Sequence, residues 1–160
     1  MTEQHERDVA FDALEPTLSA APGADATVRA AIRRGDLLFL SGQVAFEGPD
    51  LLTTGRLGDD VDVPTGQACA RQCAINLLGR TRELLGSLAN VDQVVKLTVF
   101  VASAPGFREQ HLVANGASQV FRDVLGDAGR HARSAVGMAE LPLGTPVEVE
   151  AIIAVADSAG

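Results

Sequence analysis

Apolar and polar residues alternate along several segments of the chain, the pattern of strands that bury one face. Residues 28–44, VRAAIRRGDLLFLSGQV, contain two such runs around an Arg-Gly-Asp turn, which predicts two strands joined at residues 34–36. A longer run, NVDQVVKLTVFVAS, predicts a third strand. Its expected buried side carries Val95, Leu97, Val99 and Val101.

Two further segments carry apolar residues at helical spacing. Asp62 followed by Pro64 predicts the start of the first helix, and Gly86 predicts its end. The second helix is expected within FREQHLVANGASQVFRDVLG, after the Pro105-Gly106 pair. The apolar face of the first helix is expected to contain Ala70, Cys73, Ala74, Leu77, Leu78, Leu84 and Leu85.

The C-terminal region reads HARSAVGMAELPLGTPVEVEAIIAV, two alternating runs on either side of a turn rich in Pro and Gly. This pattern predicts a closing hairpin. Arg133 lies on its first strand, and Glu148 and Glu150 share one face of its return strand.

The predicted order of elements is therefore β-β-α-β-α-β-β. Such an order favours an α+β fold, with two helices on one face of a mostly antiparallel sheet. One domain is expected over residues 1–160, with residues 1–25 as an N-terminal extension or irregular segment and residues 45–62 as a long loop. A sheet with so few aromatic side chains is a candidate for completing its burial by oligomerisation.

Charge and composition exclude several classes of function. The formal net charge is −8 and the pI is about 4.7, whereas a general nucleic-acid binder needs clustered Lys and Arg. No apolar run is long enough to span a membrane, and the charged N-terminal segment lacks the apolar core of a signal peptide. We therefore expect a cytoplasmic protein that binds neither nucleic acid nor membrane.

The cysteines and histidines do not indicate a metal or cofactor site. Cys69 and Cys73 lie four residues apart on a predicted helix, a poor arrangement for a disulfide, and we interpret them as buried apolar groups. His5, His111 and His131 are scattered along the chain. No spacing typical of metal ligands and no glycine loop that would bind a phosphate is present, so we expect no metal and no cofactor.

Arg133 is the strongest candidate for a binding residue, because a lone arginine among Ala, Val and Gly suits bidentate binding of a carboxylate. Ala135 and Gly137 share its face by alternation and would leave space beside it. The alternative is a structural ion pair with Glu148 or Glu150 across the predicted hairpin.

Three other features are candidates for chemistry. Glu148 and Glu150 can act in acid–base chemistry or position water, or can simply be solvated. Ser41 and Gly42 end an apolar strand, where the hydroxyl can donate to an oxyanion and the glycine lets a ligand approach, although a simple turn explains them equally well. Asn115 can bind a ligand or mark a helix interruption with Gly116.

Three segments, LLFLSGQV, DQVVKLTVFVAS and above all RSAVGMAELPLGTPVEVEAI, together resemble the Rid family of reactive intermediate deaminases, also called YjgF or endoribonuclease L-PSP proteins. The resemblance extends from about residue 28 to residue 155. The helical segments QACARQCAINLL and VANGAS are more similar to a divergent branch than to the founding deaminases. The family implies a chorismate-mutase-like fold and a homotrimer with clefts between subunits. Its active members hydrolyse enamines and imines to 2-oxo acids and ammonia without a cofactor.

The resemblance also implies roles for individual residues. Arg133 matches the arginine that binds the substrate carboxylate, and Glu148 matches the glutamate that positions water or transfers a proton. Ser41 matches the serine of the family's SGQ motif, with Gly42 beside it, and Asn115 matches the helix asparagine to within one residue. Ala135 borders the same cleft.

This sequence departs from the family's pattern at two positions. Val28 stands where active deaminases commonly have a tyrosine, and Ala135 stands where they commonly have a cysteine. Two functions of different classes follow: hydrolysis of enamine or imine intermediates in an inter-subunit cleft, or non-catalytic binding of small carboxylates by a regulatory trimer. Ribonuclease activity is the least favoured, because the chain is acidic and poor in aromatic residues for stacking on bases.

Overall fold

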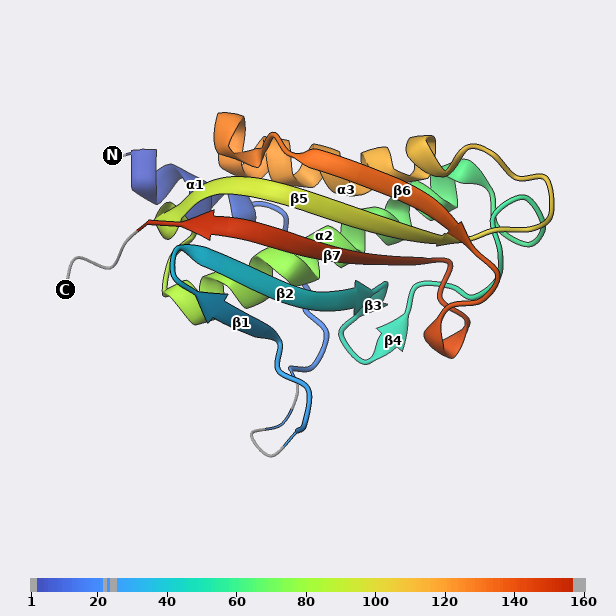
Figure 1. Ribbon diagram of the computed structural model, residues 1–160, viewed down its shortest axis with the longest axis horizontal. Coiled ribbons are helices and arrows are strands. Elements are labelled where there is room, and N and C mark those ends of the chain that lie inside the picture. The colour runs from blue at the N-terminus through green and yellow to red at the C-terminus, as the bar shows by residue number, and fades with distance from the viewer. Residues whose placement is uncertain (1–2, 22, 24–25, 157–160) are drawn as a thin grey trace.

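A five-stranded sheet with the strand order β1-β2-β7-β5-β6 forms one layer of the protein, and the helices lie together behind it (Figure 1). The computed structural model describes residues 3–21, 23 and 26–156. The strands of this sheet are β1 (Ala31–Arg34), β2 (Leu37–Val44), β5 (Val91–Ala102), β6 (Ala132–Met138) and β7 (Val147–Val155). The helices are α1 (Glu3–Asp12), α2 (Val63–Leu85) and α3 (Gln110–Leu125). This architecture confirms the predicted α+β class, with α2 and α3 on one face of a mostly antiparallel sheet.

The ends of α2 follow from local chemistry. The Asp62 carboxylate accepts a hydrogen bond from the Thr65 N–H at 2.9 Å, and hydrogen bonding with the Thr65 side chain and with this N–H lowers the pKa of Asp62. At the other end Gly86 adopts a left-handed conformation with φ of 78°, and its N–H donates to the Arg82 carbonyl at 2.8 Å. Both predicted helix boundaries are therefore confirmed.

Small residues let α2 and α3 pack closely against each other. A Cβ atom added at Gly116 of α3 would collide with the backbone carbonyl of Gln67 on α2. Cys69 and Cys73 are fully buried and free, and burial raises the pKa of Cys69 to about 11 and also raises that of Cys73. Both thiols thus act as apolar core groups, as expected. Leu84, predicted to belong to the buried face of α2, is instead 52% exposed.

An irregularity in β5 changes which of its side chains face the helices. Leu97, Val99 and Val101 are fully buried, as predicted, but Val95 is 40% exposed. The register between β5 and β7 shifts between Val94 and Lys96, and this extra residue turns Val94 rather than Val95 into the core.

The predicted closing hairpin is wrong. β6 pairs in parallel with β5, and β7 pairs antiparallel with the other edge of β5, so β5 lies between them (Figure 1). A parallel neighbour requires a crossover connection, and α3 supplies it between β5 and β6. Arg133 is therefore opposite Leu97 in the register, and Glu148 is opposite Phe100 on the far side of the same strand.

The second face of the sheet is not covered by any described element. On this face lie Ile32, Phe39, Val136 and Met138, which are 36–49% exposed. Glu148 and Glu150 belong to the same face, because Val147, Val149 and Ala151 alternate with them and are buried on the helix side. The expected loop at residues 45–62 contains a short hairpin, β3 (Phe46–Glu47) with β4 (Asp50–Leu51), and the fully buried Leu57.

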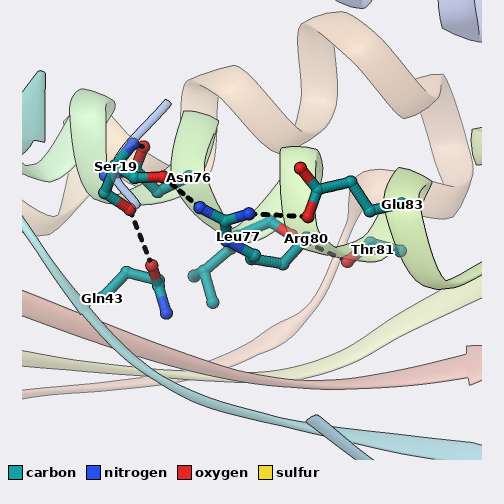
Figure 2. Close-up of polar contacts among 7 residues, drawn as sticks. All are labelled: Ser19, Gln43, Asn76, Leu77, Arg80, Thr81 and Glu83. Carbon is teal, nitrogen blue, oxygen red and sulfur yellow. Dashed lines mark hydrogen bonds and ion pairs between the residues drawn. The ribbon is translucent and has the colours of Figure 1, made fainter. Parts of the chain in front are cut away.

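The N-terminal segment differs from the irregular extension that the sequence predicts. It forms α1, whose Phe11 is fully buried, and its continuation is held by polar side chains of α2 (Figure 2). The buried Asn76 amide accepts from the Ser19 N–H at 3.1 Å and donates to the Phe46 carbonyl at 2.9 Å. Arg80, only 4% exposed, donates to the Ser19 carbonyl and pairs with Glu83 at 2.6 Å.

We expect Asn76→Ala to lower the free energy of unfolding by roughly 2–4 kcal/mol, because it removes a fully buried amide, leaves the Ser19 N–H without its acceptor and removes one of the two donors to the Phe46 carbonyl, the other being Gln72. Urea denaturation at one fixed protein concentration measures this change. Asn90→Ala is the matched control, since Asn90 is exposed and, among the described residues, its side chain makes a single hydrogen bond, to the Leu85 carbonyl at 2.9 Å. It should cost less than about 1 kcal/mol. Equal losses in the two variants would contradict the clamping role of Asn76.

Candidate functional site

Arg133 lies on the helix-facing side of the edge strand β6 and reaches α3. Its Nη1 donates to Asn115 Oδ1 and to Ser118 Oγ, each at 3.0 Å. Its Nη2 donates to the backbone carbonyl of His111 at 3.2 Å. The structure therefore brings Arg133 and Asn115 together, through three acceptors that are all uncharged.

These contacts leave one edge of the Arg133 guanidinium available. Both Nη1 protons have acceptors, whereas Nε–H and one Nη2 proton have none among the described residues. A carboxylate bound side-on uses one N–H from Nε and one from Nη2. Partial burial lowers the pKa of Arg133, yet arginine stays protonated at physiological pH. The open edge is thus suited to a planar anion.

The structural ion pair considered as an alternative role for Arg133 does not form within one chain. No carboxylate of the described residues lies within ion-pairing distance of Arg133. Glu148 and Glu150 are on the opposite face of the sheet, beyond β5. A half-buried cation with only neutral neighbours has unused capacity for an anionic ligand.

Ser118 and His131 extend the arginine's hydrogen bonds. His131 Nε2 lies 2.9 Å from Ser118 Oγ, and its Nδ1 lies 2.7 Å from the Gly129 carbonyl oxygen. The sequence reasoning missed both residues. The signal was present, however, because Asn115 and Ser118 share a helix face by their spacing of three, and His131 and Arg133 share a strand face by their spacing of two. We call Arg133, Asn115, Ser118 and His131 the arginine half-site.

Glu148 and Gly42 form a second group, on the uncovered face of the sheet. A Cβ atom added at Gly42 would collide with Glu148 Oε1, so the carboxylate lies directly over the glycine. Gly42 belongs to a bulge, because the register between β2 and β7 shifts between Leu40 and Gln43. Burial raises the pKa of Glu148, and the charge of Glu150 raises it further. We call Glu148 and Gly42 the glutamate half-site.

Ser41 and Ala135 lie beside these groups without joining them. The Ser41 hydroxyl donates to the Arg29 carbonyl at 2.6 Å and thereby holds the segment before β1. Ala135 is half-buried on the same side of β6 as Arg133. The space expected beside Gly137 is filled, since an added Cβ would meet Gln110 Nε2 at 3.0 Å and Ser103 Oγ at 3.3 Å.

A cavity of about 410 Å³ opens next to Gly42. Its walls include Ser19 from the N-terminal segment, Gln43 from β2, and Phe46 and Pro49 from the β3–β4 hairpin. The Ser19 hydroxyl donates to Gln43 Oε1 at 3.4 Å (Figure 2). The start of the long 45–62 loop thus borders the space beside the glutamate half-site.

Other expectations concern residues away from both half-sites. Val28 is 64% exposed and brings no polar group to either of them. Within the described part of the chain, no three His, Cys, Asp or Glu side chains are grouped as metal ligands. No helix found there is both long and apolar enough to cross a membrane.

Known proteins match most of the chain. A model of the family described as endoribonuclease L-PSP matches residues 18–155. Protein TCP17 of Trypanosoma cruzi is 48% identical over 120 residues, which cover 74% of this chain and 75% of TCP17. The solved structure of protein Atu1372 from Agrobacterium tumefaciens is similar with a TM-score of 0.86 and 41% identity, over 95% of this chain and 93% of that one. RidA from the Antarctic bacterium Psychrobacter sp. PAMC 21119 gives 0.57 and 28%, over 87% and 98%.

The raised pKa of Glu148 predicts a specific dependence of stability on pH. Because the folded state holds this proton more tightly than the unfolded state, its contribution is complete below the ordinary pKa of 4.5 and is lost as pH rises through the folded value. The unfolding free energy of the wild type should therefore fall, relative to Glu148→Gln, as pH increases from about 4 towards neutrality.

Urea denaturation across this pH interval measures the difference. Glu140→Gln serves as the control, since it removes an exposed carboxylate on the turn between β6 and β7. A constant difference between the wild type and Glu148→Gln at all pH values would show that the folded protein does not perturb Glu148.

Proposed function

Because the chain belongs to the endoribonuclease L-PSP family, we propose that it hydrolyses reactive enamine or imine intermediates that carry a carboxylate, giving 2-oxo acids and ammonia. The observation that carries the proposal is the open Nε/Nη2 edge of Arg133, a preformed site for a small carboxylate. The same reaction is implied by the resemblance of the RSAVGMAELPLGTPVEVEAI segment to the Rid deaminases.

The reaction site is proposed to lie between copies of the chain in a homotrimer. Arg133 and Glu148 lie on opposite faces of the sheet with β5 between them, so they cannot hold one small molecule within a single chain. The uncovered sheet face carries exposed Phe39, Val136 and Met138 around Glu148 and favours burial against another copy. In such an assembly, the arginine half-site of one copy meets the glutamate half-site of the next.

Each half-site supplies one part of the mechanism. Arg133 binds the substrate carboxylate and fixes the position of the imine carbon. Glu148 of a second copy accepts a proton from a water molecule while the oxygen of that water attacks the imine carbon. Glu148 then returns the proton to the nitrogen of the tetrahedral adduct. Next, Glu148 takes the remaining hydroxyl proton and passes it to the nitrogen as the C–N bond breaks, so that ammonia leaves and the carbon retains the oxygen of water as a carbonyl. An enamine enters the same sequence after it tautomerises to the imine, which adds a proton at carbon and removes one from nitrogen.

The environment of Glu148 suits this acid–base role. Its pKa is raised by burial and by Glu150, which brings it closer to neutral pH, where a group that both accepts and returns a proton is most effective. A charged hydrogen bond from Arg133 to a carboxylate contributes about 1.5–3 kcal/mol, enough to orient a small acid with weak affinity. The chemistry uses water and these side chains and calls for no cofactor or metal.

A second candidate is non-catalytic binding of small carboxylates by a regulatory trimer. It is favoured by the exposed Val28 and by Ala135, which supply no hydroxyl or thiol where active deaminases commonly have Tyr and Cys. Both functions use Arg133 in the same way, and they differ only in whether the bound molecule is turned over.

Other expectations from the sequence stay predictions. The net charge of −8 argues against nucleic acid as a substrate or partner, in spite of the family's name. RNA cleavage by pure protein that is lost in Arg133→Ala would contradict the prediction about nucleic acid. The cytoplasmic location also stays a prediction.

Turnover is measured by generating an imine in situ with an amino-acid oxidase and trapping it with semicarbazide, for a panel of parent amino acids. The wild type should compete with the trap. Arg133→Ala should lower the deaminase rate by about 10–100-fold at subsaturating substrate, in line with the loss of one charged hydrogen-bonded contact. Arg133→Lys should retain only part of the rate, because an ammonium cannot bind side-on.

Arg130→Ala is the matched control, since Arg130 is exposed and its side chain forms an ion pair, within the described part of the chain, only with Asp127, at 3.2 Å on the approach to β6. It should leave the rate unchanged. Full activity in Arg133→Ala would overturn the site assignment. An inactive wild type whose melting temperature rises with small carboxylates, and does not rise in Arg133→Ala, would establish the binding function instead.

A further inference from the structure

Two side chains of the arginine half-site, Ser118 and His131, have no part in the reaction proposed above. They complete a chain of hydrogen bonds that begins at Arg133 Nη1, passes through Ser118 Oγ at 3.0 Å and His131 Nε2 at a further 2.9 Å, and ends at the Gly129 carbonyl, 2.7 Å from Nδ1. The chain joins three elements: α3, β6 and the short 3-10 helix Gly126–Gly129.

The chemistry of the two ends fixes the direction of every bond. The Gly129 carbonyl can only accept, so His131 carries a proton on Nδ1. Arg133 can only donate, so Ser118 Oγ accepts from it. When His131 is neutral, its Nε2 is an acceptor for the Ser118 hydroxyl proton, and each donor in the chain meets an acceptor.

We propose that Ser118 and His131 are positioning residues: neutral His131 orients the Ser118 hydroxyl, which in turn holds the Arg133 guanidinium with its Nε/Nη2 edge free for a substrate carboxylate. This inference deepens the proposed function and rests on it for the identity of the ligand. His131 acts through Ser118 and does not touch the substrate.

Protonation of His131 would reverse one bond in the chain. Nε2 would then become a donor, and both His131 and Arg133, two cations, would point at the same serine oxygen. Among the described residues Arg133 is the charged group that acts on His131, while Ser118 and Phe121 of α3 and the Gly129 carbonyl are its uncharged neighbours. In agreement, burial and the charge of Arg133 lower the pKa of His131, against an opposing effect of the Gly129 hydrogen bond.

Steady-state kinetics of variants that remove one hydrogen bond of this chain provide the first test. Ser118→Ala should raise KM for a carboxylate-bearing imine about five- to tenfold and change kcat little, because Arg133 binds the carboxylate equally in the ground state and the transition state. Ser118→Thr should restore the wild-type KM, since it keeps the hydroxyl. An unchanged KM in Ser118→Ala would overturn the proposal.

A double-mutant cycle separates action through Ser118 from an independent effect of His131. His131→Phe keeps an aromatic ring next to Phe121, whose ring centroid lies 6.1 Å from that of His131, but removes both ring nitrogens and with them the acceptor for Ser118. It should raise KM, and Ser118→Ala combined with His131→Phe should raise KM no further than Ser118→Ala alone. If the increases in KM of the two single variants multiply in the double variant, His131 does not act through Ser118 and the proposal is wrong. Ser87→Ala is the stability control, because its hydroxyl is hydrogen-bonded to Asp8 at 2.5 Å, far from Arg133 in the sequence, and its loss should leave KM unchanged.

NMR spectroscopy tests the chain of hydrogen bonds without any turnover. ¹⁵N NMR of labelled protein should show His131 neutral at pH 7 with the proton on Nδ1, and Arg133→Met should raise the pKa of His131. If the wild type is inactive, the proposed reaction is wrong, and weaker binding of pyruvate by Ser118→Ala, read from the melting temperature, then decides the positioning role. Equal binding of pyruvate by both proteins, no binding by either, or a His131 pKa that is the same in Arg133→Met would each overturn it.

Discussion

The position of β5 between β6 and β7 is the constraint on which the arrangement of the candidate site, and so the proposed chemistry, depends. Arg133 lies on β6 and Glu148 on β7, the strands on either side of β5, and their side chains face opposite sides of the sheet. A single chain thus presents two half-sites, one with the proposed carboxylate-binding residue and the other with the proposed acid–base residue. In the proposed mechanism, only a second copy could place Arg133 and Glu148 around the same small molecule, so topology would link assembly to activity.

The arginine half-site is organised to keep a cation available. Its partners, the Asn115 amide, the Ser118 hydroxyl and the His111 carbonyl, are all neutral, and together they occupy only part of the guanidinium. A carboxylate in their place would fix Arg133 more strongly but would also neutralise it and compete with a ligand. Neutral acceptors fix the direction of the side chain while its charge stays free for an anion.

Periodicity predicted the five strands of the main sheet and the two main helices, and the capping residues Asp62 and Gly86 predicted the ends of α2, because local chemistry decides all of these. It could not identify strand partners: the alternation of β6 is the same whether its neighbour is β5 or β7, and only the crossover through α3 makes the pairing parallel. The bulge that exposes Val95 and the contact between Ser118 and His131 are likewise tertiary. Arg133 and Asn115 were candidates from the chemistry of their side chains, and the family resemblance gave them roles, whereas their direct contact required the fold.

Assembly would also tune the acid–base group itself. In one chain Glu148 is half-buried over Gly42, and burial already raises its pKa. Phe39, Val136 and Met138 on the same face are exposed, and covering them with a second copy would remove further water from the carboxylate. Desolvation disfavours the ionised form, so burial against a second copy would raise the pKa of Glu148 further towards neutrality. The same contact would bring Arg133 of the neighbouring copy to the site, and its positive charge would lower that pKa. The balance between these two effects, burial against an approaching cation, would then set the pH range over which the carboxylate can both accept and return a proton.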